Sequence, residues 1–118
     1  MPKTGQKGEE WVAQWLRQQG WELVAQRWRC PWGELDLVMH TADALVFIEV
    51  KTRRCGNWDA DGAQAITPQK QNRLRQAAAL FLAAQPRWQD TPCRFDVALV
   101  RCQGEQYHLH SYVVGAFQ

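Results

Sequence analysis

Two charged residues stand beside the most apolar stretch of the chain. Glu49 and Lys51 follow the run Leu45–Ile48, and because side chains alternate along a strand, both should lie on one face of a sheet. A carboxylate in such surroundings is costly unless it is paired or binds a metal ion. The spacing alone leaves two interpretations open: an ion pair at a strand end with Lys51 in solvent, or part of a catalytic site.

A second carboxylate is expected opposite Glu49. Residues 41–43 have the composition of a short hairpin connection. Counting back from it places Asp36 opposite Glu49 and Glu34 opposite Lys51, with cross-strand Cβ atoms about 5 Å apart. Carboxylates that close repel each other unless a cation lies between them. Mg²⁺ (or Mn²⁺) prefers oxygen ligands and retains waters that a substrate phosphate can replace, whereas nothing indicates a cysteine–histidine zinc site.

Two further residues are candidates for the same site. Glu9 leads into the apolar stripe of a helix expected over Gly5–Gln19, so it should lean towards the sheet while Glu10 faces solvent. It is either a metal ligand or only a complement to the positive helix N-terminus. Lys70 lies in the first turn of a second helix, which Thr67 should cap. Lys70 could bind a phosphate there or extend into solvent.

The order of expected elements predicts the fold class. A long helix between the third and fourth strands suits a right-handed crossover between parallel neighbours. We expect one α/β domain over residues 1–118, with a mixed sheet of about five strands flanked by two main helices. After the first helix, the expected elements are strands over Trp21–Arg29, Glu34–His40 and Ala44–Arg53, a loop over Arg54–Ala65, a helix from Thr67 to Pro86, and strands over Arg94–Cys102 and Tyr107–Val114.

Composition narrows the function classes. The net charge is only +2, but arginine supplies ten of the fourteen basic residues, and arginine suits phosphate recognition better than lysine does. No apolar run approaches the ~20 residues of a membrane helix, and the polar N-terminus does not resemble a signal peptide. We therefore expect a cytoplasmic protein without a membrane span. The four cysteines form no CxxC pair and are expected to be free thiols.

Taken together, the motifs resemble a known family. An aspartate followed by Glu-x-Lys on a neighbouring strand is similar to the PD-(D/E)XK nuclease superfamily. The wider pattern resembles the YraN family of bacterial proteins, described as uncharacterised, endonuclease-like and similar to archaeal Holliday-junction resolvases. The resemblance runs from about Gly5 to the C-terminus. Its blocks are Gly8-Glu9, Gly33-Glu34-Leu35-Asp36-Leu37, Val46-Phe47-Ile48-Glu49-Val50-Lys51-Thr52-Arg53, Thr67-Pro68-Gln69-Lys70 and Arg94-Phe95-Asp96-Val97.

This resemblance implies roles for the chemical residues. It implies a restriction-endonuclease-like αβββαβ core in which Asp36 and Glu49 hold the metal and Lys51 is the catalytic lysine. By similarity to the resolvases, Glu9 is a further acidic residue of the site. Leu35 stands where many members of the superfamily have proline before the aspartate. A homodimer is an expectation that rests on the resolvase similarity alone.

The implied substrate is nucleic acid, most simply DNA, whose phosphodiester bonds would be hydrolysed with Mg²⁺. Exposed bases could stack on Trp32 or Trp58, although core packing or the anchoring of a loop is the alternative use of each tryptophan. Glu34 is kept as an additional site candidate. Flanking phosphates are expected to be held by a set of basic residues: Lys70, Arg53, Arg27 and Arg29.

Two other functions stay open at this point. The first is a nucleic-acid-binding module that has the nuclease fold but no useful catalysis. The second is a metal- or redox-linked protein that uses the cysteines with His108 and His110, which are two apart on an expected strand. No cysteine spacing supports the second function, and a cleavage assay separates the first from a nuclease.

Overall fold

The computed structural model describes residues 4–54 and 66–118. Trp58 and most of the predicted loop lie outside these residues. Within the described ranges, no helix is both long and apolar enough to cross a membrane. The elements are α1 (Thr4–Gln18), β1 (Glu22–Cys30), β2 (Gly33–His40), β3 (Leu45–Arg53), α2 (Pro68–Ala84), the short 3-10 helix η2 (Pro86–Trp88), β4 (Cys93–Gln103) and β5 (Gln106–Phe117).

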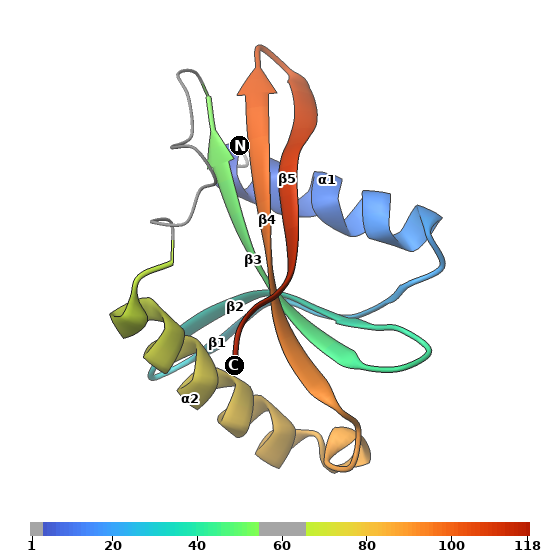
Figure 1. Cartoon of the computed structure of the whole chain (residues 1–118), viewed down its shortest axis with the longest axis vertical. Coiled ribbons are helices and arrows are strands. Elements are labelled where there is room, and N and C mark those ends of the chain that lie inside the picture. Colours follow the sequence, from blue (N-terminus) through green and yellow to red (C-terminus); the bar gives the residue numbers. More distant parts are fainter. Residues whose placement is uncertain (1–3, 55–65) are drawn as a thin grey trace.

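The strands form one mixed sheet in the order β1-β2-β3-β4-β5. β3 and β4 are parallel, and the other neighbouring pairs are antiparallel. α2 makes the crossover between the parallel pair, and Figure 1 shows α1 and α2 on opposite sides of a strongly twisted sheet. The predicted α/β class with five strands and two main helices is confirmed. β5 extends further towards the C-terminus than predicted, and η2 was not predicted.

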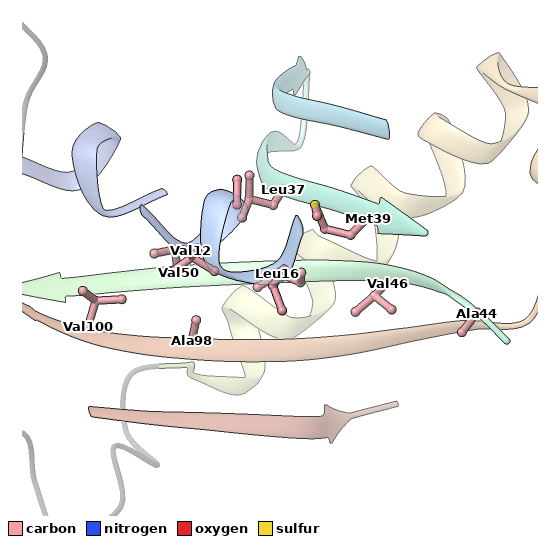
Figure 2. Close-up of a cluster of buried hydrophobic side chains, with 11 residues drawn as sticks. Val12, Leu16, Leu37, Met39, Ala44, Val46, Val50, Ala98 and Val100 are labelled. Atoms are coloured by element: carbon pink, nitrogen blue, oxygen red, sulfur yellow. The ribbon is translucent and has the colours of Figure 1, made fainter. Parts of the chain in front are cut away.

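Each helix covers its own hydrophobic core. Val12, Ala13 and Leu16 share one face of α1, as the helical spacing predicts, and are buried against the sheet. Figure 2 shows Val12 and Leu16 of this group. Ala77, Ala78 and Phe81 of α2 do the same on the other face. The fully buried Val12, Leu16 and Phe81 each contribute about 1.5–3 kcal/mol, so these stripes hold both helices on the sheet. The first core is completed by Leu37, Met39, Ala44, Val46, Ile48, Val50, Ala98 and Val100, and the second by Leu35, Val38, Leu45, Phe47 and Trp88.

The ends of the elements follow from local sequence. Gly20 adopts a φ of 91°, the left-handed conformation that glycine accepts most readily after a helix. At the start of α2, the backbone N–H of Lys70 donates to Thr67 Oγ1 at 3.2 Å, and Pro68 occupies the first turn. The sequence predicted this cap. It sets where α2 begins and therefore where Lys70 lies in the first turn.

The hairpin between β2 and β3 has the predicted register. The backbone N–H of Thr41 donates to the carbonyl of Ala44 at 2.9 Å. Pairing continues from His40↔Leu45 through Val38↔Phe47 to Leu37↔Ile48. Beyond that pair the regular β2–β3 ladder stops, and the candidate catalytic residues lie at this point.

α1 approaches β3 most closely at Gly8. A Cβ atom built at position 8 would overlap Thr52 Oγ1, a buried hydroxyl for which the structure shows no hydrogen-bond partner. The absence of a side chain at Gly8 therefore allows the helix to lie against the strand. This contact sets the position of Glu9, the next residue along the helix.

Gly8→Ala should destabilise the fold despite the better helix propensity of alanine. We expect the free energy of unfolding to fall by about 1–3 kcal/mol, because the added methyl group must push α1 away from β3. Chemical denaturation measures this change. Thr52→Ala in the same protein removes the overlapping oxygen and should restore most of the loss. A Gly8→Ala protein that equals the parent in stability would contradict the close approach.

Candidate active site

Asp36 lies where β2 and β3 separate. Its side chain is 8% exposed, and its Oδ2 accepts the backbone N–H of Val50 at 2.8 Å. A side-chain oxygen thus accepts the β3 N–H just beyond the last regular pair, Leu37↔Ile48. The carboxylate is therefore held by the backbone of the neighbouring strand.

The strand changes face at this residue. Leu35 packs in the α2 core and Leu37 in the α1 core, although residues two apart in a regular strand share a face. On the adjacent strand, Arg27 has a φ of 51°, which is uncommon for a residue with a side chain. Both strands are therefore irregular at Asp36.

Because of this irregularity, the prediction that Asp36 and Glu49 are directly opposed on one face of the sheet is wrong in detail. Asp36 does approach β3, but through the Val50 N–H rather than as a regular cross-strand partner of Glu49. The predicted pairing of Glu34 with Lys51 is not formed by the described strands. The twist at Asp36, which depends on packing on both faces, causes the difference.

Three carboxylates converge at this break. Glu9, Glu34 and Asp36 each offer an oxygen that lies within 4.8 Å of the other two. Glu9 is 7% exposed, and Glu10 is exposed, as the helix periodicity predicts. Among the described residues, this is the only group of three potential metal ligands. It includes Glu34 where the sequence predicted Glu49.

Basic side chains pair with some of these carboxylates. Arg27 Nη1 lies 3.2 Å from Glu9 Oε1, and Arg29 Nε lies 3.3 Å from Glu34 Oε2. Arg27 and Arg29 were predicted to hold substrate phosphates, and the structure places both on acidic residues of the site. Arg29 remains largely exposed.

Glu49 and Lys51 share a face of β3, as predicted. Lys51 Nζ lies 3.2 Å from Glu49 Oε1, with side chains 28% and 14% exposed respectively. The pair is therefore formed, but Lys51 is not in open solvent. The Lys51 ammonium lowers the pKa of Lys70, so two positive groups lie close together, an arrangement that favours a bound anion.

Burial raises the pKa values of the acidic residues. It raises the pKa of Asp36 to about 7, and the Glu9 carboxylate adds to this shift. Burial followed by the Asp36 carboxylate raises the pKa of Glu49 to about 7. The pKa of Glu9 is also raised, with burial as the largest cause. These carboxyl groups are difficult to ionise together because they are buried and close to one another. A divalent cation between them would stabilise their negative charges.

A cavity of about 190 Å³ lies beside Glu34 and Glu49, whereas Asp36 and Glu9 are not part of its lining. Its charged lining comes from β2, β3 and α2, and its remaining lining from the β1–β2 turn and the inner side of α2. Within the described chain, the sequence-predicted residues Glu34, Glu49, Lys51 and Lys70 thus meet at one opening, whereas Arg53 is exposed at the end of β3. The complete lining is Trp32, Gly33, Glu34, Glu49, Lys51, Lys70, Arg73, Leu74 and Ala77.

The sequence analysis gave no role to Arg73 and named Asp96 only within a motif of the family resemblance. Arg73 lines the cavity one turn after Lys70, and the spacing of three residues could have indicated it. Asp96 is fully buried between Phe95 and Val97, a sequence setting like that of Asp36.

Asp96 has a structural role. It accepts hydrogen bonds from Tyr112 Oη at 2.6 Å, the Gly115 N–H at 2.9 Å and Arg94 Nε at 3.0 Å. These bonds use its acceptor capacity to attach β5 to β4. A buried aspartate that is satisfied in this way stabilises the sheet edge rather than a ligand.

The cysteine and histidine alternative gains nothing from the structure. Cys30, Cys93 and Cys102 are free thiols, as predicted. His108 and His110 are exposed on β5, and none of these five residues belongs to the ligand group found among the described residues.

The family model and the relatives found by comparison with known proteins identify the same family. The family model described as "Uncharacterised protein family UPF0102" matches residues 8–100. A UPF0102 protein of Synechococcus sp. (strain JA-3-3Ab) is 53% identical, covering 100% of this chain and 92% of the relative. A UPF0102 protein of Thermosynechococcus vestitus is also 53% identical, covering 99% and 95%. One from Gloeobacter violaceus is 49% identical, covering 95% and 90%.

The stability of the metal-free protein should fall as the pH rises from about 4 to about 7. Folded Asp36 and Glu49 lose their protons at a pKa of about 7, whereas carboxyl groups of the unfolded chain do so near 4. Between these values the folded state binds more protons, so the free energy of unfolding decreases with pH. Denaturant titrations in a chelator at several pH values measure this slope.

Asp36→Asn isolates the contribution of one carboxyl group. The amide oxygen can still accept the Val50 N–H, but the charge is gone. We expect the variant to exceed the parent in stability by on the order of 1–3 kcal/mol at pH 8 and to match it at about pH 4, where the unfolded carboxyl group is also protonated. Asp43→Asn, in the exposed hairpin turn, is the control and should change neither value. The same pH slope in Asp36→Asn and the parent would contradict the burial argument.

Proposed function

This chain belongs to the uncharacterised protein family UPF0102, and we propose that it is a Mg²⁺-dependent endonuclease acting on the phosphodiester bonds of DNA. The membership confirms the YraN family assignment made from the motifs. The names of the relatives state no activity, so the proposal rests on the site. The observation that supports the proposal most strongly is the convergence of Glu9, Glu34 and Asp36 next to the Glu49–Lys51 pair.

The residues fit a hard divalent cation. All the converging side chains offer oxygen, which Mg²⁺ and Mn²⁺ prefer. The described basic residues pair with Glu9, Glu34 and Glu49, while Asp36 is bonded to a backbone N–H. Asp36 would therefore be the central ligand, with Glu9, Glu49 or Glu34 beside it. Bound there, the ion supplies Lewis acidity and lowers the pKa of a ligated water.

The chain's own residues supply the remaining requirements of phosphodiester hydrolysis. Lys51 Nζ, held at 3.2 Å from Glu49, can neutralise charge that builds on the phosphoryl oxygens. Glu49 can orient the attacking water through a hydrogen bond. Lys70 and Arg73 of α2 line the same cavity and can hold the phosphate by charge-assisted hydrogen bonds.

The same residues argue against a module that only binds. A phosphate-binding surface works best with cations alone, because carboxylates repel the phosphate. Here buried carboxylates adjoin the cations, and burial raises the pKa values of Asp36 and Glu49. Their ionised forms therefore destabilise the folded protein. A polar cluster that lowers the stability of the folded protein is typical of a catalytic site.

Removal of a carboxylate should separate cleavage from binding. We expect Glu49→Gln and Asp36→Asn to lower the Mg²⁺-dependent cleavage rate by about 10²–10⁴-fold. Binding of DNA should be unchanged or tighter, because a negative charge is lost. The assay uses branched, flapped, single-stranded and duplex DNA with Mg²⁺ or Mn²⁺, and measures binding in Ca²⁺.

Glu10→Gln is the matched control, because Glu10 lies on α1 beside Glu9 but faces solvent. It should cleave at the parental rate. Cleavage by Glu49→Gln or Asp36→Asn at the parental rate would remove these residues from the site. A parent protein that binds DNA but cleaves none of the substrates would favour the binding module instead.

A further inference from the structure

We infer that the cavity beside Lys51 takes an unpaired nucleobase stacked on Trp32, so the substrate carries an unstacked nucleotide next to the phosphate that is attacked. This inference rests on the proposed function, since it assumes a nucleic-acid ligand at the same site. It adds the class of substrate: single strands, flaps and junctions rather than uninterrupted duplex.

The position of Trp32 is unlike that of the other described tryptophans. Those pack in or against the two cores: Trp11, Trp15, Trp21, Trp28 and Trp88. Trp32 is 46% exposed and occupies the two-residue turn closed by the pair Cys30↔Gly33. Tight turns usually carry small or polar residues. An indole at the tip of a short hairpin is held on a rigid support without being needed for core packing.

Trp32 lines the cavity that also holds the Glu49–Lys51 pair of the proposed site. It shares this lining with Glu49, Lys51 and Lys70. The side chain of Trp32 is partly exposed as well as lining the cavity. The ring can therefore be reached by a ligand that also touches the basic groups.

The composition of the cavity matches a nucleotide. Lys51, Lys70 and Arg73 can bind phosphate, while Trp32 and Leu74 offer apolar surface. A base supplies a flat apolar face on one side of a sugar and the phosphate supplies the charge on the other. A purely apolar peptide would leave three cations and two carboxylates of this lining without use.

Geometry then requires that the base be unpaired. In a duplex the bases are stacked inside and only the backbone reaches a cavity lined by lysine and arginine. A base can reach Trp32 in that cavity only if it is already unstacked or is flipped out, which costs a few kcal/mol in an intact duplex and least where pairing is absent. Any base can stack on an aromatic ring. The site should therefore select nucleic acids by their structure and not by their base sequence.

The test measures binding in the presence of Ca²⁺, so that it does not depend on cleavage. The probes are a fluorescent oligothymidine, the matched blunt duplex and a flapped duplex. We expect the parent to bind the single strand and the flap more tightly than the duplex. Trp32→Ala should weaken those two interactions by about 5–100-fold and change duplex binding by less than about 2-fold.

Two variants control the experiment. Trp32→Phe keeps an aromatic face and should retain most of the preference for unpaired probes. Leu80→Ala, at an exposed position of α2 that is 39% exposed and outside the cavity lining, should leave all three affinities unchanged.

Equal losses of single-strand and duplex affinity in Trp32→Ala, or no loss at all, would overturn the inference. A protein that shows the Trp32-dependent preference but never cleaves would support the base site while contradicting the endonuclease proposal. A protein that cleaves duplex at a rate independent of Trp32 would do the reverse.

Discussion

The site is organised around a single buried carboxylate that replaces a backbone acceptor between two strands. Asp36 accepts the Val50 N–H exactly where regular β2–β3 pairing ends. Because this bond fixes the side chain, Glu9 from α1 and Glu34 from β2 come within 4.8 Å of it. The close approach of α1, which Gly8 allows, and the face change of β2 both serve this arrangement. The proposed cation would stabilise the ionised forms of these three carboxyl groups.

Two buried aspartates in similar sequence settings have different roles, and the surrounding hydrogen bonds distinguish them. Asp96 receives three donors from β4 and β5 and holds the sheet edge. Asp36 receives one backbone N–H and faces other carboxylates. The capped start of α2 adds Lys70 and Arg73 to the lining of the cavity. Acidic groups from one part of the fold and basic groups from another thus meet at one opening.

Local sequence patterns predicted the elements and much of the site. The hairpin register followed from the short connection at residues 41–43, because turn length determines which residues pair. Helical periodicity placed Glu9 towards the sheet and Glu10 in solvent, and the Thr67 cap located Lys70. These features depend on interactions between residues near in sequence, or on the alternation of a single element.

The remaining features depend on tertiary packing and could not be predicted in this way. The twist at Asp36 requires two cores on opposite faces and a positive φ at Arg27, a residue type that rarely adopts it. The pairing of Arg27 with Glu9 joins residues on different elements. The hairpin register placed Glu34 opposite Lys51 and made it a site candidate, but it did not predict that Glu34 would join Glu9 and Asp36. Trp58 lies outside the described residues.

Direct location of a bound cation tests the central claim. Crystals grown at about pH 8 and soaked in Mn²⁺ would give an anomalous difference map that identifies the ion. The account predicts a peak in contact with Asp36 and at least one of Glu9, Glu34 and Glu49, and its loss in Asp36→Asn crystals. A saturated soak with no peak at Asp36, or an equal peak in the variant, would contradict it.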